Sequence, residues 1–223
     1  MQKSHSVHLA NIIIPDEKLQ KVSAGKFAVN EIFYSLQGEG ANAGTPMVFL
    51  RFAECNLRCS IKNSGFNCDT EFSSSRELSL DEVLSEIAKL SPAAKWVILT
   101  GGEPGLQVSE SLVSALHESG YKIAIETNGT VKLPKNIDWI TVSPKSAEHT
   151  LRQRTANEVK YVRTKGMALP LTSIEADHYF ISPAFQADGS LAKEDLDWCV
   201  DLSKESAGKW KLSVQMHKLL GLR

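Results

Sequence analysis

Short apolar runs that end in polar, glycine-rich motifs recur along this chain, and they restrict the folds it can adopt. Buried strands are predicted over 47–52, 95–100 and 121–126. Apolar residues at helical spacing over 79–90 and 108–116 alternate with these strands. Such alternation predicts a parallel sheet with crossover connections, either open or closed into a barrel. Ligands of these sheets bind at the carboxyl ends of the strands, where the polar motifs stand here.

The remaining elements complete an α/β pattern. A capping box at Ser79 and Glu82 begins the first helix, and Gly120 ends the second. Further strands are predicted over 28–36, 138–142, 159–163, 179–181 and 210–214, and a further helix over 192–202. No repeat or linker divides the chain, so we expect a single domain over 1–223, with an N-terminal extension over 1–26.

Composition and charge exclude several classes of protein. Of the 223 residues, 42% are hydrophobic and 23% are charged, which is typical of a globular protein rather than a disordered or membrane chain. No apolar run approaches the roughly 18 residues of a membrane span. The first residues also lack the pattern of a secretory signal, so we expect a cytoplasmic protein. A net charge of −1 provides no positive field, so neither nucleic acid nor a membrane is an expected partner.

Three of the four cysteines lie in one segment, the loop over 53–70. Cys55, Cys59 and Cys68 have the spacing C-x3-C-x8-C. In a reducing compartment, cysteines this close are more often metal ligands or catalytic groups than disulfides. Three thiolates would leave one position of an iron–sulfur cluster open, whereas a structural zinc would need a fourth protein ligand. Cys199 shares helical spacing with Leu196 and is interpreted as a core residue.

Two other features have more than one interpretation at this point. Arg51 interrupts the apolar run 47–52, so it either binds a carboxylate of a ligand or closes an internal salt bridge. The segment 37–40, Gln-Gly-Glu-Gly, is either a plain turn or a turn whose backbone approaches a ligand.

Taken together, the motifs resemble a known superfamily. Three cysteines after a strand, Gly101-Gly102-Glu103-Pro104 after a later strand and Glu126-Thr127-Asn128-Gly129 after the next resemble the radical S-adenosylmethionine enzymes. Their usual cysteine spacing is C-x3-C-x2-C, and this chain has six extra residues in its second interval.

A closer resemblance covers roughly 28–223 and points to the 7-carboxy-7-deazaguanine synthase family. The motifs that carry it are Leu36-Gln37-Gly38-Glu39-Gly40, Cys68-Asp69-Thr70, Thr100-Gly101-Gly102-Glu103-Pro104, Ser143-Pro144-Lys145 and His217-Lys218. The resemblance implies a partial parallel β/α barrel and a carbon–nitrogen lyase of queuosine biosynthesis. It also implies conversion of 6-carboxy-5,6,7,8-tetrahydropterin to 7-carboxy-7-deazaguanine by radical ring contraction with loss of ammonia.

The resemblance further implies cofactors and partners. They are a [4Fe-4S] cluster, S-adenosylmethionine, Mg²⁺, an external electron donor such as flavodoxin or ferredoxin, and a second copy of the chain in a homodimer. The cofactor supplies the radical chemistry, and the protein supplies placement and exclusion of water.

Residue roles follow from the same resemblance. Cys55, Cys59 and Cys68 would hold the cluster, and Thr70 would bind Mg²⁺, although Thr70 could instead cap a turn. The residues expected at S-adenosylmethionine are Asn67, Cys68, Asp69, Gly101, Gly102, Glu103, Glu126, Asn128, Ser143, Pro144, Lys145, Ser146, Ser182, Pro183, Ala184 and Phe185. Those expected at the substrate are Leu36, Gln37, Gly38, Glu39, Arg51, Thr100, His217 and Arg223.

Two other functions remain open from the sequence. One is a different radical S-adenosylmethionine enzyme, such as a glycyl-radical activase, which would share the cofactor motifs but not the turn at 37–40 or the His217 tail. The other is a non-catalytic zinc-binding module. An assay of substrate turnover would distinguish the first alternative from a 7-carboxy-7-deazaguanine synthase. Analysis of bound iron and zinc would distinguish the second alternative from both kinds of enzyme.

Overall fold

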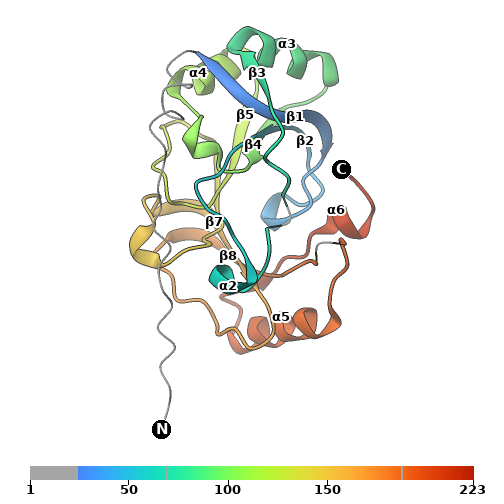
Figure 1. Ribbon diagram of the computed structural model, residues 1–223, viewed down its shortest axis with the longest axis vertical. Coiled ribbons are helices and arrows are strands. Elements are labelled where there is room, and N and C mark those ends of the chain that lie inside the picture. The colour runs from blue at the N-terminus through green and yellow to red at the C-terminus, as the bar shows by residue number, and fades with distance from the viewer. Residues whose placement is uncertain (1–24, 69, 187) are drawn as a thin grey trace.

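The computed structural model describes residues 25–68, 70–186 and 188–223 (Figure 1). Most of the predicted extension 1–26, together with Asp69, therefore lies outside the described residues. The described part forms one nine-stranded sheet in the order β3-β1-β2-β4-β5-β6-β7-β8-β9. Its strands are β1 (Lys26–Leu36), β2 (Pro46–Phe52), β3 (Arg76–Ser79), β4 (Trp96–Gly101), β5 (Lys122–Thr127), β6 (Trp139–Val142), β7 (Thr155–Arg163), β8 (Glu175–Pro183) and β9 (Lys211–Leu212).

The sheet is mostly but not wholly parallel. Strands β2, β4, β5, β6, β7, β8 and β9 pair in parallel, whereas β1 runs antiparallel to both β2 and β3. The 37–45 connection is too short for a crossover, so β1 and β2 form a hairpin-like antiparallel pair. The sequence-based expectation of a mostly parallel partial barrel is thus confirmed, with β1 as the exception.

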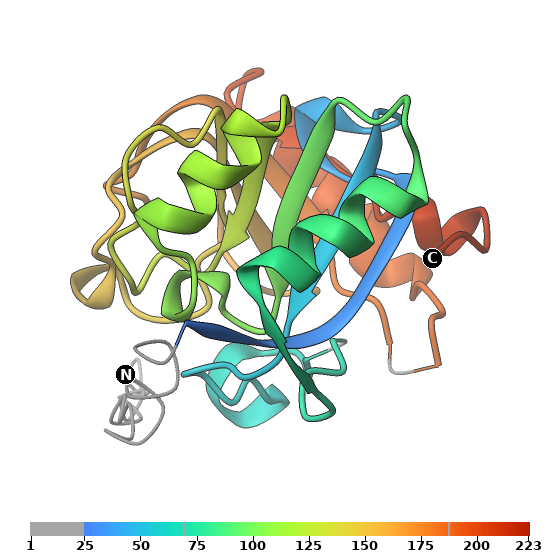
Figure 2. The same cartoon turned by 90° about the horizontal axis from the view of Figure 1, so that it is seen from above.

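Helices cover only part of the outer face of the sheet. They are α2 (Ile61–Ser64), α3 (Leu80–Leu90), α4 (Glu110–Glu118), α5 (Lys193–Glu205) and α6 (Met216–Leu219). As Figure 2 shows, α3 and α4 lie side by side against the sheet. Their buried residues, including Val83, Ile87 and Leu112, pack against outward-facing strand residues such as Leu50 and Leu99. Between β5 and β8 the chain crosses in loops with one 3₁₀ turn at Glu148–Thr150, so the helical layer is incomplete there. In the described part of the chain, no helix is long and apolar enough to span a membrane.

Two local predictions, the capping box of α3 and the core position of Cys199, can be compared with the structure. The predicted capping box of α3 is present: Ser79 Oγ accepts from Glu82 N at 3.3 Å, and Ser79 N donates to Glu82 Oε2 at 2.7 Å. Cys199 is fully buried beside Leu202 and Trp210, so its assignment to the core is confirmed. Its Sγ donates to the carbonyl oxygen of Arg163 at 3.6 Å.

Three short elements are not expected from the sequence, and one is shorter than expected. Strand β3, helix α2 and helix α6 each have only four residues, too few to show a period. Strand β9 covers two residues of the predicted 210–214 because only Lys211 and Leu212 pair with β8.

The inner face of the sheet changes from apolar to polar along the strands. Met47, Ile98 and Ala124 fill it near the amino ends, together with Phe49, Trp96 and Trp139. Two residues beyond Phe49, Ile98 and Ala124, the same face carries Arg51, Thr100 and Glu126, because alternate side chains of a strand point the same way. This polar layer lies at the end where ligands bind in parallel α/β sheets.

Candidate active site

A cavity lies at the carboxyl ends of the parallel strands and is lined by residues from distant parts of the chain. Most of the residues predicted for the site line it: Leu36, Gln37, Glu39, Arg51, Cys55, Cys59, Asn67, Cys68, Thr70, Thr100, Gly101, Gly102, Glu126, Asn128, Ser143, Lys145, Ser182, Pro183, Ala184, Phe185, His217 and Arg223. Gly38, Glu103, Pro144 and Ser146 do not line it, and Asp69 lies outside the described residues.

The cysteine loop brings three thiols to one wall of this cavity. Cys55 accepts a hydrogen bond from Leu57 N at 3.4 Å. Burial raises the pKa of Cys55 to about 11, with smaller raising contributions from Glu103 and the other two thiols. Cys199, a buried residue of α5, does not line the cavity.

The extra residues between Cys59 and Cys68 form a compact turn of helix. Ser60 N donates to Asn63 Oδ1 at 2.8 Å at the start of α2, and Gly65 ends it with a φ of 81°. A Cβ on Gly65 would lie 2.6 Å from Met167 Cε, so α2 packs against the loop that joins β7 to β8. Phe66, the next residue, lines the cavity and has Lys145 Nζ 5.6 Å from its ring centre. The insertion therefore adds an aromatic wall beside the thiols.

The two glycines after β4 have a packing role that their sequence position does not reveal. A Cβ on Gly102 would lie 1.8 Å from Glu54 O, and one on Gly101 would lie 2.2 Å from Phe52 O. Gly102 N donates to Phe52 O at 3.0 Å, and Glu103 N donates to Glu54 O at 2.9 Å. The end of β4 thus packs directly on the backbone that leads into Cys55.

Glu103 faces away from the cavity. Its fully buried carboxylate accepts from Thr127 Oγ1 at 2.6 Å, Asn128 N at 2.7 Å and Gly105 N at 2.8 Å. Burial raises its pKa, and these three donors oppose the rise. The sequence-based expectation that Glu103 accepts directly from the cofactor is not supported by this geometry. It holds the loop after β5 in place instead.

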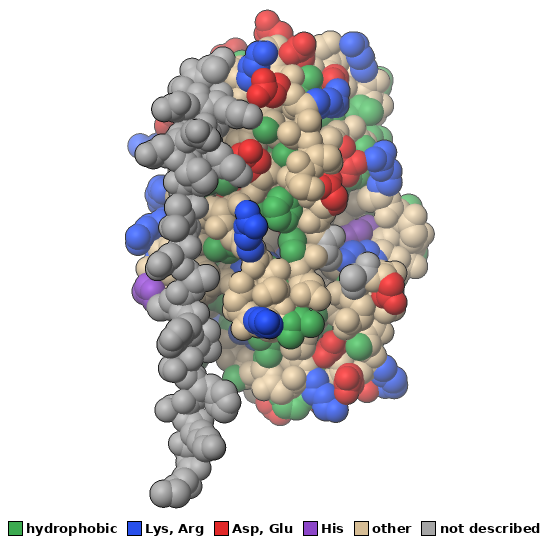
Figure 3. All heavy atoms as spheres, in the orientation of Figure 1, with side chains coloured by type: hydrophobic (Ala, Val, Ile, Leu, Met, Phe, Trp, Pro, Cys, Tyr) green, Lys and Arg blue, Asp and Glu red, His purple; other side chains and the backbone are tan. Residues whose placement is uncertain are grey.

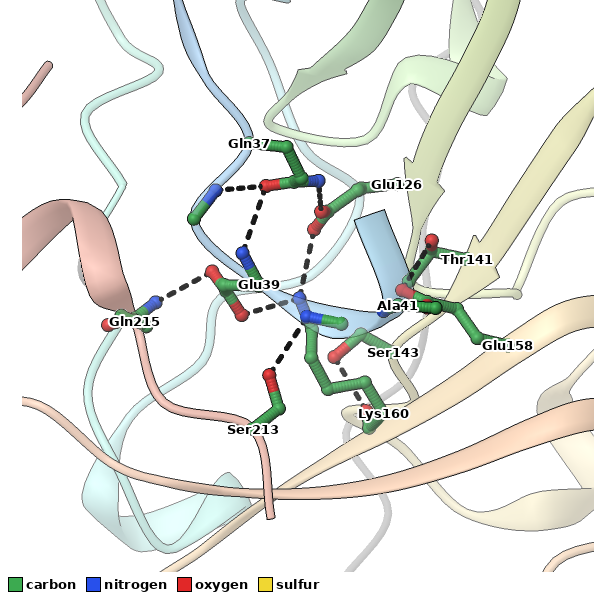
Figure 4. Close-up of polar contacts among 12 residues, drawn as sticks. Gln37, Glu39, Ala41, Glu126, Thr141, Ser143, Glu158, Lys160, Ser213 and Gln215 are labelled. Carbon is green, nitrogen blue, oxygen red and sulfur yellow. Dashed lines mark hydrogen bonds and ion pairs between the residues drawn. The ribbon is translucent and has the colours of Figure 1, made fainter. Parts of the chain in front are cut away.

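The centre of the polar layer is a buried lysine that sequence reasoning missed (Figure 4). Lys160 on β7 is 3% exposed, and its Nζ lies 2.5 Å from Glu39 Oε2 and 3.2 Å from Glu126 Oε2. Burial by itself would lower the pKa of Lys160, but Glu126 and Glu39 more than offset this, so its pKa is raised. Lys160 interrupts the apolar run Val159–Val162 in the way that Arg51 interrupts 47–52, and this signal could have identified it.

The turn after β1 is held from three sides. Gln37 Nε2 donates to Glu126 Oε1 at 2.8 Å, while Gln37 Oε1 accepts from Gly38 N at 2.7 Å. On β7, Glu158 Oε2 accepts from Ala41 N at 2.9 Å. In the segment after β9, Ser213 Oγ accepts from Gly40 N at 2.9 Å. A plain surface turn would lack these contacts, so the turn joins β1 to β7 and to the segment after β9.

Arg51 forms the internal salt bridge that the sequence left open, and its side chain also lines the cavity. Its Nε forms an ion pair with Glu31 Oε1 at 3.5 Å across the β1–β2 pair, so the internal salt bridge is present. The same buried Nε makes no hydrogen bond among the described residues, and the side chain lines the cavity. Glu31 also pairs with Arg223, whose guanidinium lies 5.0 Å from the ring centre of Phe33.

The C-terminal tail covers one side of the cavity. Met216 N donates to Gly38 O at 2.9 Å, and a Cβ on Gly38 would lie 2.1 Å from His217 Nδ1. Gly38 thus lies beneath His217 rather than at the cavity itself. Burial lowers the pKa of the His217 imidazole, and the nearby carboxylates of Glu39 and Glu126 oppose the shift. Lys218 Nζ lies 4.9 Å from the ring centre of Phe185 on the opposite wall.

Other lining residues also went unpredicted. They are Phe33, Phe49, Leu57, Phe66, Phe72, Ile98, Thr127, Lys160, Val162, Gln215 and Lys218. Most are apolar residues of strands or loops, which nothing in the sequence separates from core residues. Phe33 and Phe49 stack with ring centres 4.9 Å apart and form an apolar wall of the cavity.

The donor set fits a cluster better than a single zinc ion. Among residues 25–68, 70–186 and 188–223, no group of three or more His, Cys, Asp or Glu side chains is gathered tightly enough for one metal ion. A structural zinc needs four ligands converging on one point. An iron–sulfur cluster can be held by three thiolates that bind different irons, and three thiols line this cavity.

Known proteins resemble this chain over most of its length. A 7-carboxy-7-deazaguanine synthase from Bacteroides thetaiotaomicron is 42% identical over 196 residues, covering 87% of this chain and 98% of the relative. One from Burkholderia multivorans is 38% identical over 213 residues, covering 88% and 99%. The crystal structure of QueE from Escherichia coli matches with a TM-score of 0.66 and 23% identity, covering 92% of this chain and all of that one. No protein-family model matches the chain.

The relatives show that the chain is a lyase of the radical S-adenosylmethionine class, and its mostly parallel partial barrel agrees with this. Within that class, the chain belongs to the 7-carboxy-7-deazaguanine synthase family of queuosine biosynthesis. The family, the fold and the carbon–nitrogen lyase activity expected from the sequence are thereby confirmed.

Proposed function

We propose that this chain converts 6-carboxy-5,6,7,8-tetrahydropterin to 7-carboxy-7-deazaguanine in the cavity described above, with a [4Fe-4S] cluster, S-adenosylmethionine and Mg²⁺ bound there. The observation that carries the proposal is that three thiols, the Gly101-Gly102 backbone and the layer of Arg51, Glu39 and Glu126 line one cavity. This combination provides ligands for a cluster at one end and polar partners for a charged heterocycle at the other.

The cluster and S-adenosylmethionine would occupy the end of the cavity near the cysteine loop. Cys55, Cys59 and Cys68 hold the cluster, which together with S-adenosylmethionine supplies the hydrogen-abstracting radical when bound. The residues that orient S-adenosylmethionine are those of the cofactor set that line the cavity: Asn67, Cys68, Gly101, Gly102, Asn128, Ser143, Lys145, Ser182, Pro183, Ala184 and Phe185. Glu126, which the resemblance places at S-adenosylmethionine, also lines the cavity but is bound to Lys160 and Gln37, so we propose it for the substrate instead. Glu103 supports this set from behind by fixing Thr127 and Asn128.

The substrate would lie between the polar layer and the C-terminal tail. Arg51 pairs with the substrate carboxylate, which supplies the hydrogen-bond acceptor that its buried Nε lacks within the described chain. Thr70 binds Mg²⁺ through its hydroxyl, which makes no hydrogen bond to another described residue. The polar edge of the substrate ring contacts the amide of Gln37 and the carboxylates of Glu39 and Glu126. The ring is bordered by Thr100, His217 and Arg223.

The partners that we propose are an acidic electron donor, such as a flavodoxin or ferredoxin, and a second copy of the chain. The surface over the cysteine loop exposes Arg58, Lys62 and Ile61, the last of them 65% exposed. Figure 3 shows basic and apolar side chains together on the middle of this face. A basic and apolar surface beside a buried redox group favours an acidic electron donor. Leu219 and Leu220, 62% and 60% exposed on the tail, support a contact with a second copy. In this proposal the enzyme works in the cytoplasm, where thiols stay reduced.

Anaerobic turnover tests the proposal. Reconstituted protein supplied with reductant, S-adenosylmethionine and Mg²⁺ is expected to consume the carboxytetrahydropterin and to form 7-carboxy-7-deazaguanine, followed by chromatography and mass spectrometry. Cleavage of S-adenosylmethionine without any change in the pterin would favour another enzyme of the class. Bound zinc without iron or sulfide would end both enzyme proposals.

The Thr70→Ala variant tests the metal assignment within the same assay. Removing the hydroxyl takes away one hard oxygen ligand, so the Mg²⁺ concentration needed for half-maximal activity is expected to rise severalfold while iron content stays unchanged. Thr150→Ala, in a 3₁₀ turn outside the cavity, is the matched control. An Mg²⁺ response equal to that of the wild type would remove Thr70 from the site.

A further inference from the structure

Lys160 is an unusual residue for the interior of a sheet. It lies in the middle of β7, and its side chain is only 4% exposed. A buried ammonium is costly unless its charge is paired and its donors are satisfied. Two carboxylates from different elements, Glu39 after β1 and Glu126 on β5, supply that pairing.

Each carboxylate has one oxygen on Lys160 and the other on an amide. Glu126 Oε1 accepts from Gln37 Nε2 at 2.8 Å, and Glu39 Oε1 accepts from Gln215 Nε2 at 3.1 Å. A carboxylate oxygen can accept two hydrogen bonds, so one bond at each oxygen still leaves acceptor capacity at the cavity that both residues line. Figure 4 shows Gln37, Glu39, Glu126 and Lys160 linked in this way.

The ammonium fixes the positions of these acceptors. Without it, two carboxylates would face each other in a water-poor site, where like charges repel and at least one of them turns away or takes up a proton. With it, the two carboxylates converge on one ammonium, and their positions are set by Nζ, which lies 2.5 Å from Glu39 Oε2 and 3.2 Å from Glu126 Oε2.

We propose that Lys160 is a positioning residue that sets substrate specificity: it holds Glu39 and Glu126 as paired acceptors for the neighbouring N–H donors of a 2-aminopyrimidinone ring. A ring without the 2-amino group would leave one buried acceptor unpaired, and such sites reject analogues that lack the matching donor. This inference rests on the proposed function, because it concerns the same substrate, but it assigns a role to a residue that would not itself react.

Binding measurements on cluster-free protein test the proposal without turnover. The two probes are 7-carboxy-7-deazaguanine and its 2-deamino counterpart, titrated with Mg²⁺ present and followed by calorimetry. Wild type is expected to bind the amino compound more tightly by about tenfold or more, since the analogue leaves a buried acceptor unpaired. Lys160→Met is expected to reduce that ratio to within about threefold, and Lys160→Arg to restore part of it.

Matched variants separate positioning from general damage. Lys193→Met removes an 84% exposed lysine paired with Asp197 and is expected to keep the wild-type ratio. If Lys160→Met does not fold, as judged by circular dichroism and thermal unfolding, Lys160→Gln replaces it, because Gln keeps a donor without the charge.

The outcomes distinguish this inference from the proposed function. A Lys160 variant that folds and discriminates as well as wild type overturns the inference alone. Equal weakening of both compounds also overturns it, because that result shows a structural role. Wild-type protein that binds neither compound overturns the proposed substrate and the inference together.

Discussion

At the scale of single residues, Arg51 shows how one side chain can serve both the fold and a ligand. Its ion pair with Glu31 at 3.5 Å holds the guanidinium in place, while its Nε has no hydrogen-bond acceptor in the described chain. Such an arrangement is pre-organised, because the protein has already fixed the group that the substrate carboxylate would meet.

We therefore predict that Arg51→Ala raises KM for the carboxytetrahydropterin by about tenfold to a hundredfold with a smaller change in kcat, since a charge-assisted hydrogen bond is lost. Steady-state kinetics at saturating S-adenosylmethionine would measure this. Glu31→Gln is the comparison, because it removes the internal pair but keeps the guanidinium. Equal defects in the two variants would show that Arg51 acts only through Glu31.

At the scale of elements, the contact between the end of β4 and the start of the cysteine loop is the tightest backbone approach near the site. A methyl group on Gly102 would lie 1.8 Å from Glu54 O, so Gly102→Ala forces the two segments apart. We predict a protein that folds but incorporates less iron on reconstitution, measured by iron analysis and absorbance.

Gly120→Ala is the control for that prediction. Gly120 has a φ of +85° but open space around its Cβ position. Its replacement should cost about 1–2 kcal/mol of stability from the left-handed backbone alone, and iron content should stay at the wild-type level. Wild-type iron content in Gly102→Ala would contradict the role of this contact.

The elements also show what the sequence could and could not predict. Strands such as β2, β4 and β5 were predictable because their apolar runs are bounded by glycines and polar motifs, and α3 because of its capping box. The direction of β1 was not, since a strand has the same pattern in either direction. Site residues within motifs were predictable as a set. Lys160 could be noticed as a charge inside an apolar run, but its partners could not be predicted, because they lie 121 and 34 positions away in the chain and only the curled sheet brings them together.

At the scale of the whole molecule, the partial barrel is closed by side chains. Strands β3 and β9 are the sheet edges, yet the turn after β1 reaches β7 through Glu158, which accepts from Ala41 N and from Thr141 Oγ1, both at 2.9 Å. Burial raises the pKa of Glu158, and the nearby charge of Glu126 adds to this. A raised pKa in the folded state means that the stability from this carboxyl is present at low pH and is lost as pH rises through the folded-state pKa.

We accordingly predict that Glu158→Gln gains stability relative to wild type as pH rises from 4 to 8. The gain should approach about 1.4 kcal/mol for each unit by which the pKa is raised. Denaturant unfolding of both proteins across this range would measure it. Glu175→Gln, at an exposed strand start, is the control. A difference between Glu158→Gln and wild type that stays constant with pH would contradict the prediction.

A barrel that is completed by a turn and its side chains differs in stiffness from a barrel that is completed by paired strands. Backbone pairing fixes the girth of a closed barrel by strand number and stagger. Here the turn after β1 is joined to β7 and to the segment after β9 by a few polar contacts. They include those made by the side chains of Glu39, Lys160, Glu158 and Ser213. A bound heterocycle that contacts Arg51 on one side and the carboxylates of Glu39 and Glu126 on the other would connect these elements and restrict their relative movement. Substrate binding would then fill the cavity and make the barrel more rigid at the same time. Such coupling suits a reaction from which solvent must be excluded.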